Sequence, residues 1–363
     1  MGAVLRSAAA VPGLTRDPFA SSATVGSMGP RALLFSASLL AALSSRAGDL
    51  SLEARVDSGR WMRGASISPR KGEAIALRVA PRPGATIRWY RIYADLSRYY
   101  KNANHPWEPS PYAWAGWGKI PYLREELQGL RGRWEINPLD TSGRVLRGEE
   151  LEPHPAKAPH YVEDVGTFWF QAEVEAGGAV SRSPGLERSD HRGLSPQVFR
   201  ISIREGEGYL GYLTSFFNVP GVFGSVPHQS YNYIGVDCAD VLMAARARWM
   251  GKPLERDFNV ASLVEELPRA ATVQIRQGAP DRALSIGKDV RPGDLFAVRY
   301  TRARQFQHVG AFYSDGNANG LLDADDLVLH AGPEALHLSR LGEGAFDGEV
   351  AILRPERGRP PGR

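Results

Sequence analysis

The sequence predicts an α+β protein, in which a β-sandwich is followed by a half that combines one long helix with a small antiparallel sheet. Several segments in the first half of the 363-residue chain alternate apolar and polar residues, which is typical of half-buried strands. One segment that begins at residue 238 instead repeats apolar residues with a helical period. The length suggests two domains, because a domain holds roughly 100–200 residues.

Composition excludes several classes of protein. Apolar residues make up 43% and charged residues 23% of the chain, which is typical of a globular protein and excludes wholesale disorder. The net charge of +4 is too small to indicate a partner such as nucleic acid. No apolar run reaches the ~18 residues needed to span a bilayer, so we expect no stable membrane insertion. The oligomeric state stays unknown from the sequence.

The first 47 residues are typical of a leader with a signal peptide. Arg31 precedes an apolar run at 32–43, which is long enough for a signal-peptide core and too short for a membrane span. Small residues occupy both peptidase-recognised positions in Ser45-Arg46-Ala47, so we expect cleavage after Ala47 and a secreted, periplasmic or extracellular protein. Translation from Met28 and a disordered leader are the alternatives. Since the chain has one cysteine, an exported form holds either a buried thiol or one kept for chemistry.

Residues 48–203 read as a β-sandwich. Helical patterns are missing between the alternating segments, and strands in such a succession favour two packed sheets. The predicted strands lie at 73–79, 87–93, 166–174 and 198–203. Between the second and third lies a segment dense in aromatic residues, from Tyr99 to Tyr122. We expect these aromatics to pack onto the sandwich, with partner or sugar binding as the alternative.

The motif Asp164-x-Gly166-x-Phe168-x-Phe170 resembles the signature of immunoglobulin-like domains. Trp89 stands where such domains carry a core tryptophan, and Phe170 replaces their usual cysteine. The resemblance implies an Ig-like sandwich whose core needs no disulfide.

A helix is predicted to begin at the single cysteine. Asp237 is suited to be its N-cap, and Gly251 and Pro253 end it. The unpaired N–H groups of a helix N-terminus favour a thiolate and can also stabilise an oxyanion. The apolar stripe consists of Cys238, Val241, Leu242, Ala245 and Trp249.

Three apolar strands follow, and two of them carry a histidine at one end. His308 opens the strand at 308–313, and His330 lies near the end of the strand at 327–332. If these strands pair in antiparallel fashion, the two imidazoles become neighbours. His308 is then the candidate base for the thiol, and His330 the residue that orients it.

Four segments together resemble the NlpC-type family of papain-like cell-wall peptidases. They are the residues at 235–240 (GVDCAD), 292–295 (PGDL), 307–310 (QHVG) and 328–331 (VLHA). The resemblance implies a papain-like α+β domain at 204–356, followed by a disordered tail at 357–363. It also implies a thiol protease that hydrolyses amide bonds in peptidoglycan stem peptides, with Cys238, His308 and His330 as catalytic residues.

Several residues near the cysteine add to this interpretation or depart from it. Asp240 stands where the family usually has glycine. The family often carries a tyrosine upstream of the cysteine, so Tyr231 or Tyr233 is a candidate for the substrate pocket. Gln229 is a candidate for assisting the oxyanion.

Two other functions stay open. In the first, Cys238 is simply buried, and the chain is a non-catalytic secreted protein that binds a partner or has a structural role. In the second, the same thioester chemistry serves an acyltransferase, which passes the acyl group to an amine rather than to water.

The segment between the two histidine strands resembles an EF-hand-type calcium loop. Oxygen donors alternate along it, and Gly320 permits the sharp bend that such loops need. We expect a structural Ca²⁺ here, with a polar hairpin as the alternative. The expected ligands are Asp315, Asn317, Asn319, Leu321 through its carbonyl, Asp323 and Asp326.

Overall fold

The computed structural model describes residues 50–102, 120–140, 146, 151, 153–190 and 193–355. They all belong to one compact unit of the chain, Ser45–Arg363. The predicted leader, most of the aromatic segment and the predicted tail lie outside the described residues.

The fold is rich in β-structure, so the predicted α+β class with a papain-like second half is wrong. Strands make up 36% of the structure and helices 15%. Among the described residues only α3 is longer than seven residues, and the other α-helices are short turns between strands. The resemblance rested on the segments around the cysteine and histidines, and these segments omit the strands that complete a large curled sheet. The α-helices are α1 (Tyr209–Thr214), α2 (Pro227–Tyr231), α3 (Cys238–Trp249) and α4 (Val260–Glu266).

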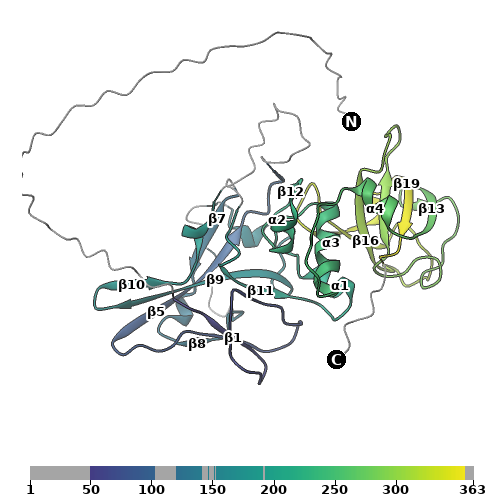
Figure 1. The fold of residues 1–363 in the computed structure, drawn as a ribbon. Helices are drawn as coiled ribbons and strands as arrows, with labels where there is room; N and C mark the ends of the chain where they lie inside the picture. Colours follow the sequence, from purple (N-terminus) through teal and green to yellow (C-terminus); the bar gives the residue numbers. More distant parts are fainter. Residues whose placement is uncertain are drawn as a thin grey trace, which may run out of the picture. The chain divides into compact units, whose positions relative to one another are not determined.

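Two sheets hold most of the chain before residue 204 (Figure 1). The first has the strand order β2-β1-β4-β8, with β1 (Glu53–Val56), β2 (Met62–Arg63), β4 (Ile75–Arg78) and β8 (Glu135–Ile136). The second has the order β3-β11-β9-β5-β7, with β10 beside β9. Its strands are β3 (Ser66–Ile67), β5 (Ala85–Ala94), β7 (Tyr122–Glu126), β9 (Gly166–Ala176), β10 (Ala179–Arg182) and β11 (Phe199–Ile203). The four strands predicted from alternation correspond to β4, β5, β9 and β11.

The inner faces of these two sheets share one apolar core. Leu77 of β4, Trp89 of β5 and Phe170 of β9 are fully buried in it. The indole N–H of Trp89 donates to the carbonyl of Arg133 at 2.8 Å, so burying this ring leaves no donor unpaired. Burying each large side chain stabilises the fold by about 1.5–3 kcal/mol.

A short parallel pair links the chain after β5 to the segment that precedes the cysteine. It consists of β6 (Tyr100–Lys101) and β12 (Val222–Phe223). This pair holds Tyr99 close to the turn that leads into α3. Short 3₁₀ helices, η1 to η4, occupy connections at Gln128–Leu130, Pro155–Lys157, Leu186–Arg188 and Leu341–Glu343.

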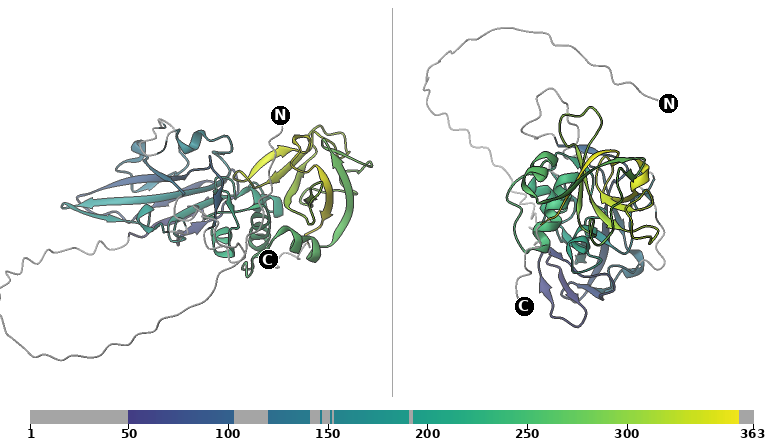
Figure 2. Two further views of the ribbon diagram at one scale, coloured as in Figure 1. Left: turned by 90° about the horizontal axis from the view of Figure 1, so that it is seen from above. Right: turned by 90° about the vertical axis from the view of Figure 1, so that its right-hand side faces the viewer.

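The remaining strands form one antiparallel sheet of seven strands, which curls (Figure 2). Its order is β14-β13-β19-β15-β16-β17-β18. The predicted strands at 295–298, 308–313 and 327–332 correspond to β15, β16 and β17. The seven strands are β13 (Arg269–Arg276), β14 (Ala279–Pro280), β15 (Leu295–Arg299), β16 (His308–Ser314), β17 (Leu327–His330), β18 (His337–Arg340) and β19 (Gly348–Leu353).

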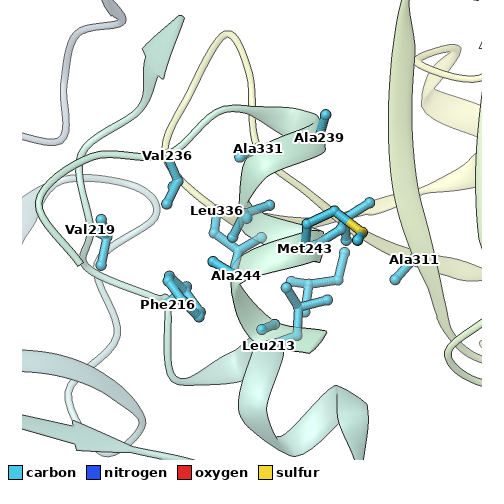
Figure 3. Close-up of a cluster of buried hydrophobic side chains, with 14 of the residues drawn as sticks. Leu213, Phe216, Val219, Val236, Ala239, Met243, Ala244, Ala311, Ala331 and Leu336 are labelled. Carbon is cyan, nitrogen blue, oxygen red and sulfur yellow. The ribbon is translucent and has the colours of Figure 1, made fainter. Parts of the chain in front are cut away.

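Each face of this sheet has its own core. Ala297 of β15 and Ala311 of β16 face α3, whose residues 239–245 are all buried. In Figure 3, Met243 lies on the side of α3 toward Ala311, whereas Phe216 and Val219 lie on the other side. The helix is therefore buried on more faces than its predicted stripe. The alternate strand residues, such as Phe296 and Phe312, pack on the opposite face of the sheet.

Candidate active site

Cys238 is the first residue of α3, as predicted. The preceding residue, Asp237, is extended and accepts the backbone N–H groups of Ala239 at 3.1 Å and Asp240 at 2.9 Å. It is therefore the N-cap that the sequence indicated. Ser225 fixes the same turn, because its Oγ accepts the N–H of Asp237 and donates to the Asp240 carboxylate at 2.8 Å.

The two histidines are neighbours, as the antiparallel pairing of their strands predicts. His308 begins β16 and His330 ends β17. His308 Nε2 lies 3.0 Å from His330 Nδ1, and His330 Nε2 lies 2.8 Å from the Oγ of Ser339 on β18. Gly310 makes room for this arrangement, since a Cβ there would lie 2.9 Å from the Cβ of His330. The strands thus hold a chain of three polar side chains.

Apolar surroundings keep both imidazoles neutral. The ring of Phe346 lies 5.3 Å from that of His308 and 5.4 Å from that of His330. Burial lowers the pKa of His308 to about 4 and that of His330 well below its usual value. A neutral imidazole has a lone pair that can accept a proton, which is what a general base needs.

The thiol lies where β16 and β17 separate. The N–H of Phe312 donates to the carbonyl of Asp294, on the side of β16 that faces β15. Because N–H groups alternate in direction along a strand, the N–H of Val309 points to the opposite side, toward β17. The pairing of β16 with β17 does not extend to Val309, so β17 does not bind this N–H. This N–H contacts the Cys238 sulfur and favours its thiolate. Within the described part of the chain, no hydrogen bond joins the sulfur to an imidazole. His308 Nε2 is hydrogen bonded to His330, so Nδ1 is the ring nitrogen of His308 that could accept the proton of the thiol.

The environment of the thiol favours its protonated form. Burial raises the pKa of Cys238 well above that of a free cysteine, and the carboxylates of Asp237 and Asp240 add to the shift. The N–H groups of Val309 and Ala239 lower the pKa by less. Burial and the nearby acids thus oppose the thiolate that the helix N-terminus favours.

Three carboxyl groups lie behind the cysteine turn. Burial raises the pKa of Asp237 to about 7, and it also raises the pKa values of Asp240 and Asp257, which hydrogen bond to each other. Two carboxyl groups in such contact share one proton rather than ionise together. Asp240, the departure from the family's glycine, is thus a buried structural residue bonded to Ser225.

These shifts predict the pH dependence of stability. Folded Asp237 keeps its proton up to a pKa of about 7, whereas unfolded aspartate loses it near 3.8, so its contribution to stability falls as pH rises between these values. His308 acts in the opposite direction, because its pKa changes from 6.5 unfolded to about 4 folded. Asp237→Asn keeps a good N-cap and removes only the first contribution. We expect urea unfolding of this variant to show a steeper gain of stability from pH 4 to 7 than wild type, and an unchanged slope would contradict the shift at Asp237.

Tyr99 is a site residue that the sequence did not reveal. Its hydroxyl lies 3.2 Å from the position of a Cβ on Gly332, which follows β17 closely. Burial raises the pKa of Tyr99, and the charges of Asp237 and Cys238 add to the shift, so its hydroxyl lies within electrostatic range of both. In the sequence, Tyr99 belongs to a run of aromatics expected to pack onto the sandwich. Only the pairing of β6 with β12 brings it to the cysteine.

The candidate pocket residues have structural contacts. Tyr233 is 1% exposed, stacks on Phe216 and bonds to the hydroxyl of Ser215 at 2.9 Å, so it belongs to the core. Gln229 is fully buried and accepts the N–H of Val226. The ring of Tyr231 lies 4.3 Å from the guanidinium of Arg248. The structure brings His308 and His330 together, and it brings the cysteine to Val309, the residue that follows His308.

A hollow of about 520 Å³ lies at the same end of the curled sheet as His308. It is lined by the end of β13, the end of β15 and the start of β19, and three arginines are among its residues. Tyr300 also lines it, and burial raises the pKa of that phenol, with a smaller contribution from the Cys238 charge. The arginines of the hollow are Arg276, Arg299 and Arg302.

The predicted calcium loop brings four polar side chains together. Asp323 Oδ2 lies 2.9 Å from the amide nitrogen of Asn317 and 2.6 Å from that of Asn319, and Asp315 accepts the N–H of Gly320 at 2.8 Å. Gly320 has φ of +79°, as the sharp bend requires. Asp326 is fully buried and accepts the N–H groups of Gly316 and Asp323.

The loop offers carboxylate and amide oxygens, which are the donor type that a hard cation prefers. In the described part of the chain, no group of three or more His, Cys, Asp or Glu residues is arranged as a metal site. Two of the converging side chains here are asparagines, and asparagine is not among these four residue types. To bind a cation, the two amides would have to turn their oxygens toward it. Each oxygen of Asp326 keeps a second lone pair beside the N–H it accepts.

Across the described residues, the helices are too short or too polar to cross a bilayer. Comparison with models of protein families finds no match, and neither does comparison with curated proteins or with solved structures. A function for this chain therefore rests on the geometry around Cys238 and its two histidines.

Proposed function

We propose that this chain is an exported cysteine hydrolase that cleaves amide bonds. Cys238 is the nucleophile, His308 is the base, and His330 orients the base. The observation that supports this most strongly is the arrangement at the end of the curled sheet. There the sulfur contacts the N–H of Val309, and the adjacent His308 bonds to His330 at 3.0 Å. A thiol, a neutral imidazole and an orienting group are the parts that thiol hydrolysis needs.

The reaction follows from the protonation states. Cys238 Sγ attacks the amide carbonyl carbon while its proton passes to His308 Nδ1, so the resting pair is neutral rather than an ion pair. Among the described residues the N–H of Cys238 has no intramolecular partner, and it is a donor for the oxyanion. His308 then gives the proton to the leaving amine, and water hydrolyses the thioester.

Peptidoglycan stem peptides are the proposed substrates. The four sequence segments suggest this class of substrate. Digestion of purified peptidoglycan, read by mass spectrometry, tests the proposal. Added amine acceptors distinguish the transferase alternative, because a transferase yields acyl-amine products in place of free carboxylates.

A non-catalytic binding protein is the second candidate. The raised pKa of the thiol and the missing sulfur–imidazole hydrogen bond favour it. An electrophilic peptide probe distinguishes the two. If the chain is a hydrolase, the probe labels Cys238 faster in wild type than in the His308→Ala variant. If the thiol is inert and buried, the probe labels it slowly in both proteins.

Export is proposed from the leader alone. N-terminal sequencing of the mature protein from culture medium or periplasm should begin at Gly48, if cleavage follows Ala47. Retention of the leader in the purified native protein would contradict this.

We also propose a structural Ca²⁺ in the loop at 315–326, which lies between the two histidine strands. Extracellular calcium modules have dissociation constants of about 10⁻⁴–10⁻³ M. At the tighter limit and ~1 mM calcium, binding stabilises the folded state by about 1.4 kcal/mol. We expect the melting temperature to rise by roughly 3–6 °C in calorimetry, and EDTA to reverse the rise.

Asp315→Asn is the informative variant for this loop, because it removes the charge and keeps one of the two oxygens that accept the N–H groups of Asn319 and Gly320. It should lose most of the calcium response. Asp281→Asn, at an exposed position outside the loop, is the matched control and should keep the full response. A melting temperature indifferent to calcium and EDTA would make the loop an ordinary hairpin connection and leave the catalytic proposal intact.

A further inference from the structure

Ser339 completes the polar chain that starts at His308. It lies on β18 opposite Val328 of β17, and its side chain is nearly buried, with 6% exposed. Its Oγ is 2.8 Å from His330 Nε2. In the described part of the chain, this imidazole is the hydroxyl's hydrogen-bond partner. The three groups therefore form a continuous sequence, Ser339 Oγ to His330 and His330 to His308.

A neutral imidazole carries one proton, so each bond in this sequence fixes the next. If Ser339 donates to His330 Nε2, then His330 carries its proton on Nδ1 and donates it to His308 Nε2. The proton of His308 must then lie on Nδ1, which has no lone pair to offer the thiol in that form. If Ser339 instead accepts from His330 Nε2, both imidazoles carry their protons on Nε2. His308 Nδ1 is then free to accept a proton.

We propose that Ser339 is a positioning residue that accepts the Nε2–H of His330 and so sets His308 in the tautomer that can act as a base. This inference rests on the proposed hydrolase function. Ser339 forms no bond with substrate, and no proton leaves it during the reaction. Its oxygen holds the proton of His330 away from His308 Nε2, which is the condition for the thiol proton to reach Nδ1.

The surroundings leave this choice to Ser339. The ring of His337 lies 4.3 Å from that of His330, but His337 Nδ1 bonds to the carbonyl of Ala335 at 2.8 Å. His160 stacks on His337 and not on the catalytic pair. The ring of Phe346 packs against both His308 and His330 and offers neither of them a hydrogen bond. Because no carboxylate bonds to either ring among the described residues, a hydroxyl takes the place that an acidic group fills in other triads.

Nitrogen NMR of histidine-labelled protein tests the tautomers directly and needs no substrate. In wild type at neutral pH, we expect the Nε2–H form for both His308 and His330, assigned with His308→Asn and His330→Asn. In Ser339→Ala, the Nε2–H of His330 loses its acceptor, so both rings should shift toward the Nδ1–H form. Nδ1–H imidazoles in wild type, or tautomers unchanged in Ser339→Ala, would overturn the inference whether or not the protein cleaves amides.

Kinetics supply the second readout. Ser339→Ala should lower kcat by on the order of 10- to 100-fold with little change in KM, since the base is lost and binding is not. Ser339→Thr keeps the oxygen and suits a strand, so it should restore kcat and the Nε2–H tautomers. Ser314→Ala, at the far end of β16, is the matched control and should match wild type. Loss of kcat in Ser339→Thr equal to that in Ser339→Ala, with both proteins melting like wild type, would contradict a role for the oxygen.

Discussion

Replacing Cys238 by alanine should abolish amide cleavage and leave the fold nearly unchanged. The variant removes the only thiol of the chain, and loss of a covalent nucleophile costs on the order of 10⁴-fold or more in kcat. The side chain is only partly buried, and the N-cap bonds of Asp237 do not involve it. The melting temperature should therefore change little.

The measurement pairs peptidoglycan digestion, read by mass spectrometry, with calorimetry of the same samples. Cys238→Ser is the second variant, because it keeps a polar atom of similar size but a far weaker nucleophile, and it should be inactive too. Full activity in Cys238→Ala would exclude Cys238 as the nucleophile. A loss of about 2 kcal/mol or more in stability, in a protein whose wild type cleaves nothing, would instead identify a packed structural thiol.

Local structure followed from the sequence where apolar residues repeat with the period of a strand or a helix. The alternation at 87–93 and 166–174 located β5 and β9, and the apolar stripe after residue 238 located α3 with Asp237 as its cap. The same periodicity put His308 and His330 at adjacent ends of paired strands. These predictions depend on neighbours within one or two strands, which is the range over which the pattern carries information.

The predicted fold class was wrong because two strands of the curled sheet, β13 and β19, were not recognised in the sequence. In β19 the four residues from Val350 to Leu353 are buried on both faces, so they do not alternate. In β13 most residues are at least partly exposed, and the strand reads as polar. These two strands pair with each other, and β19 joins β13 to β15 in the curled sheet. The resemblance to a family with more helix was local to four short segments and could not supply these strands.

Parts of the candidate site were likewise beyond the sequence. Tyr99 reaches the thiol through a two-residue parallel pair, and Ser339 reaches His330 across the register of β17 with β18. Neither contact leaves a signal in a single sequence, since each depends on how distant segments meet. Tyr233 shows the reverse error, because proximity to the cysteine in sequence placed it in a pocket while its ring packs in the core.

Replacing His308 by alanine should lower kcat/KM by about 10²- to 10⁴-fold, the usual contribution of a general base. The pH profile carries the sharper test. Burial lowers the pKa of His308 to about 4 and raises that of the thiol, so the resting pair is neutral. Activity needs unprotonated His308, so it should be lost as pH falls through about 4 and should show no fall near pH 6–8 from loss of an imidazolium.

Alkylation of Cys238 by iodoacetamide gives the matching result for the free protein. Its rate should rise toward alkaline pH, with a midpoint above that of free cysteine, because the thiol lacks an ion-pair partner. His160→Asn, at a histidine outside the catalytic chain, should match wild type in both measurements. An alkylation plateau at acidic pH that disappears in His308→Ala would show a thiolate–imidazolium pair instead. In that case His308 would already hold the thiol proton before substrate binds, and the helix N-terminus would have outweighed Asp237 and Asp240 after all.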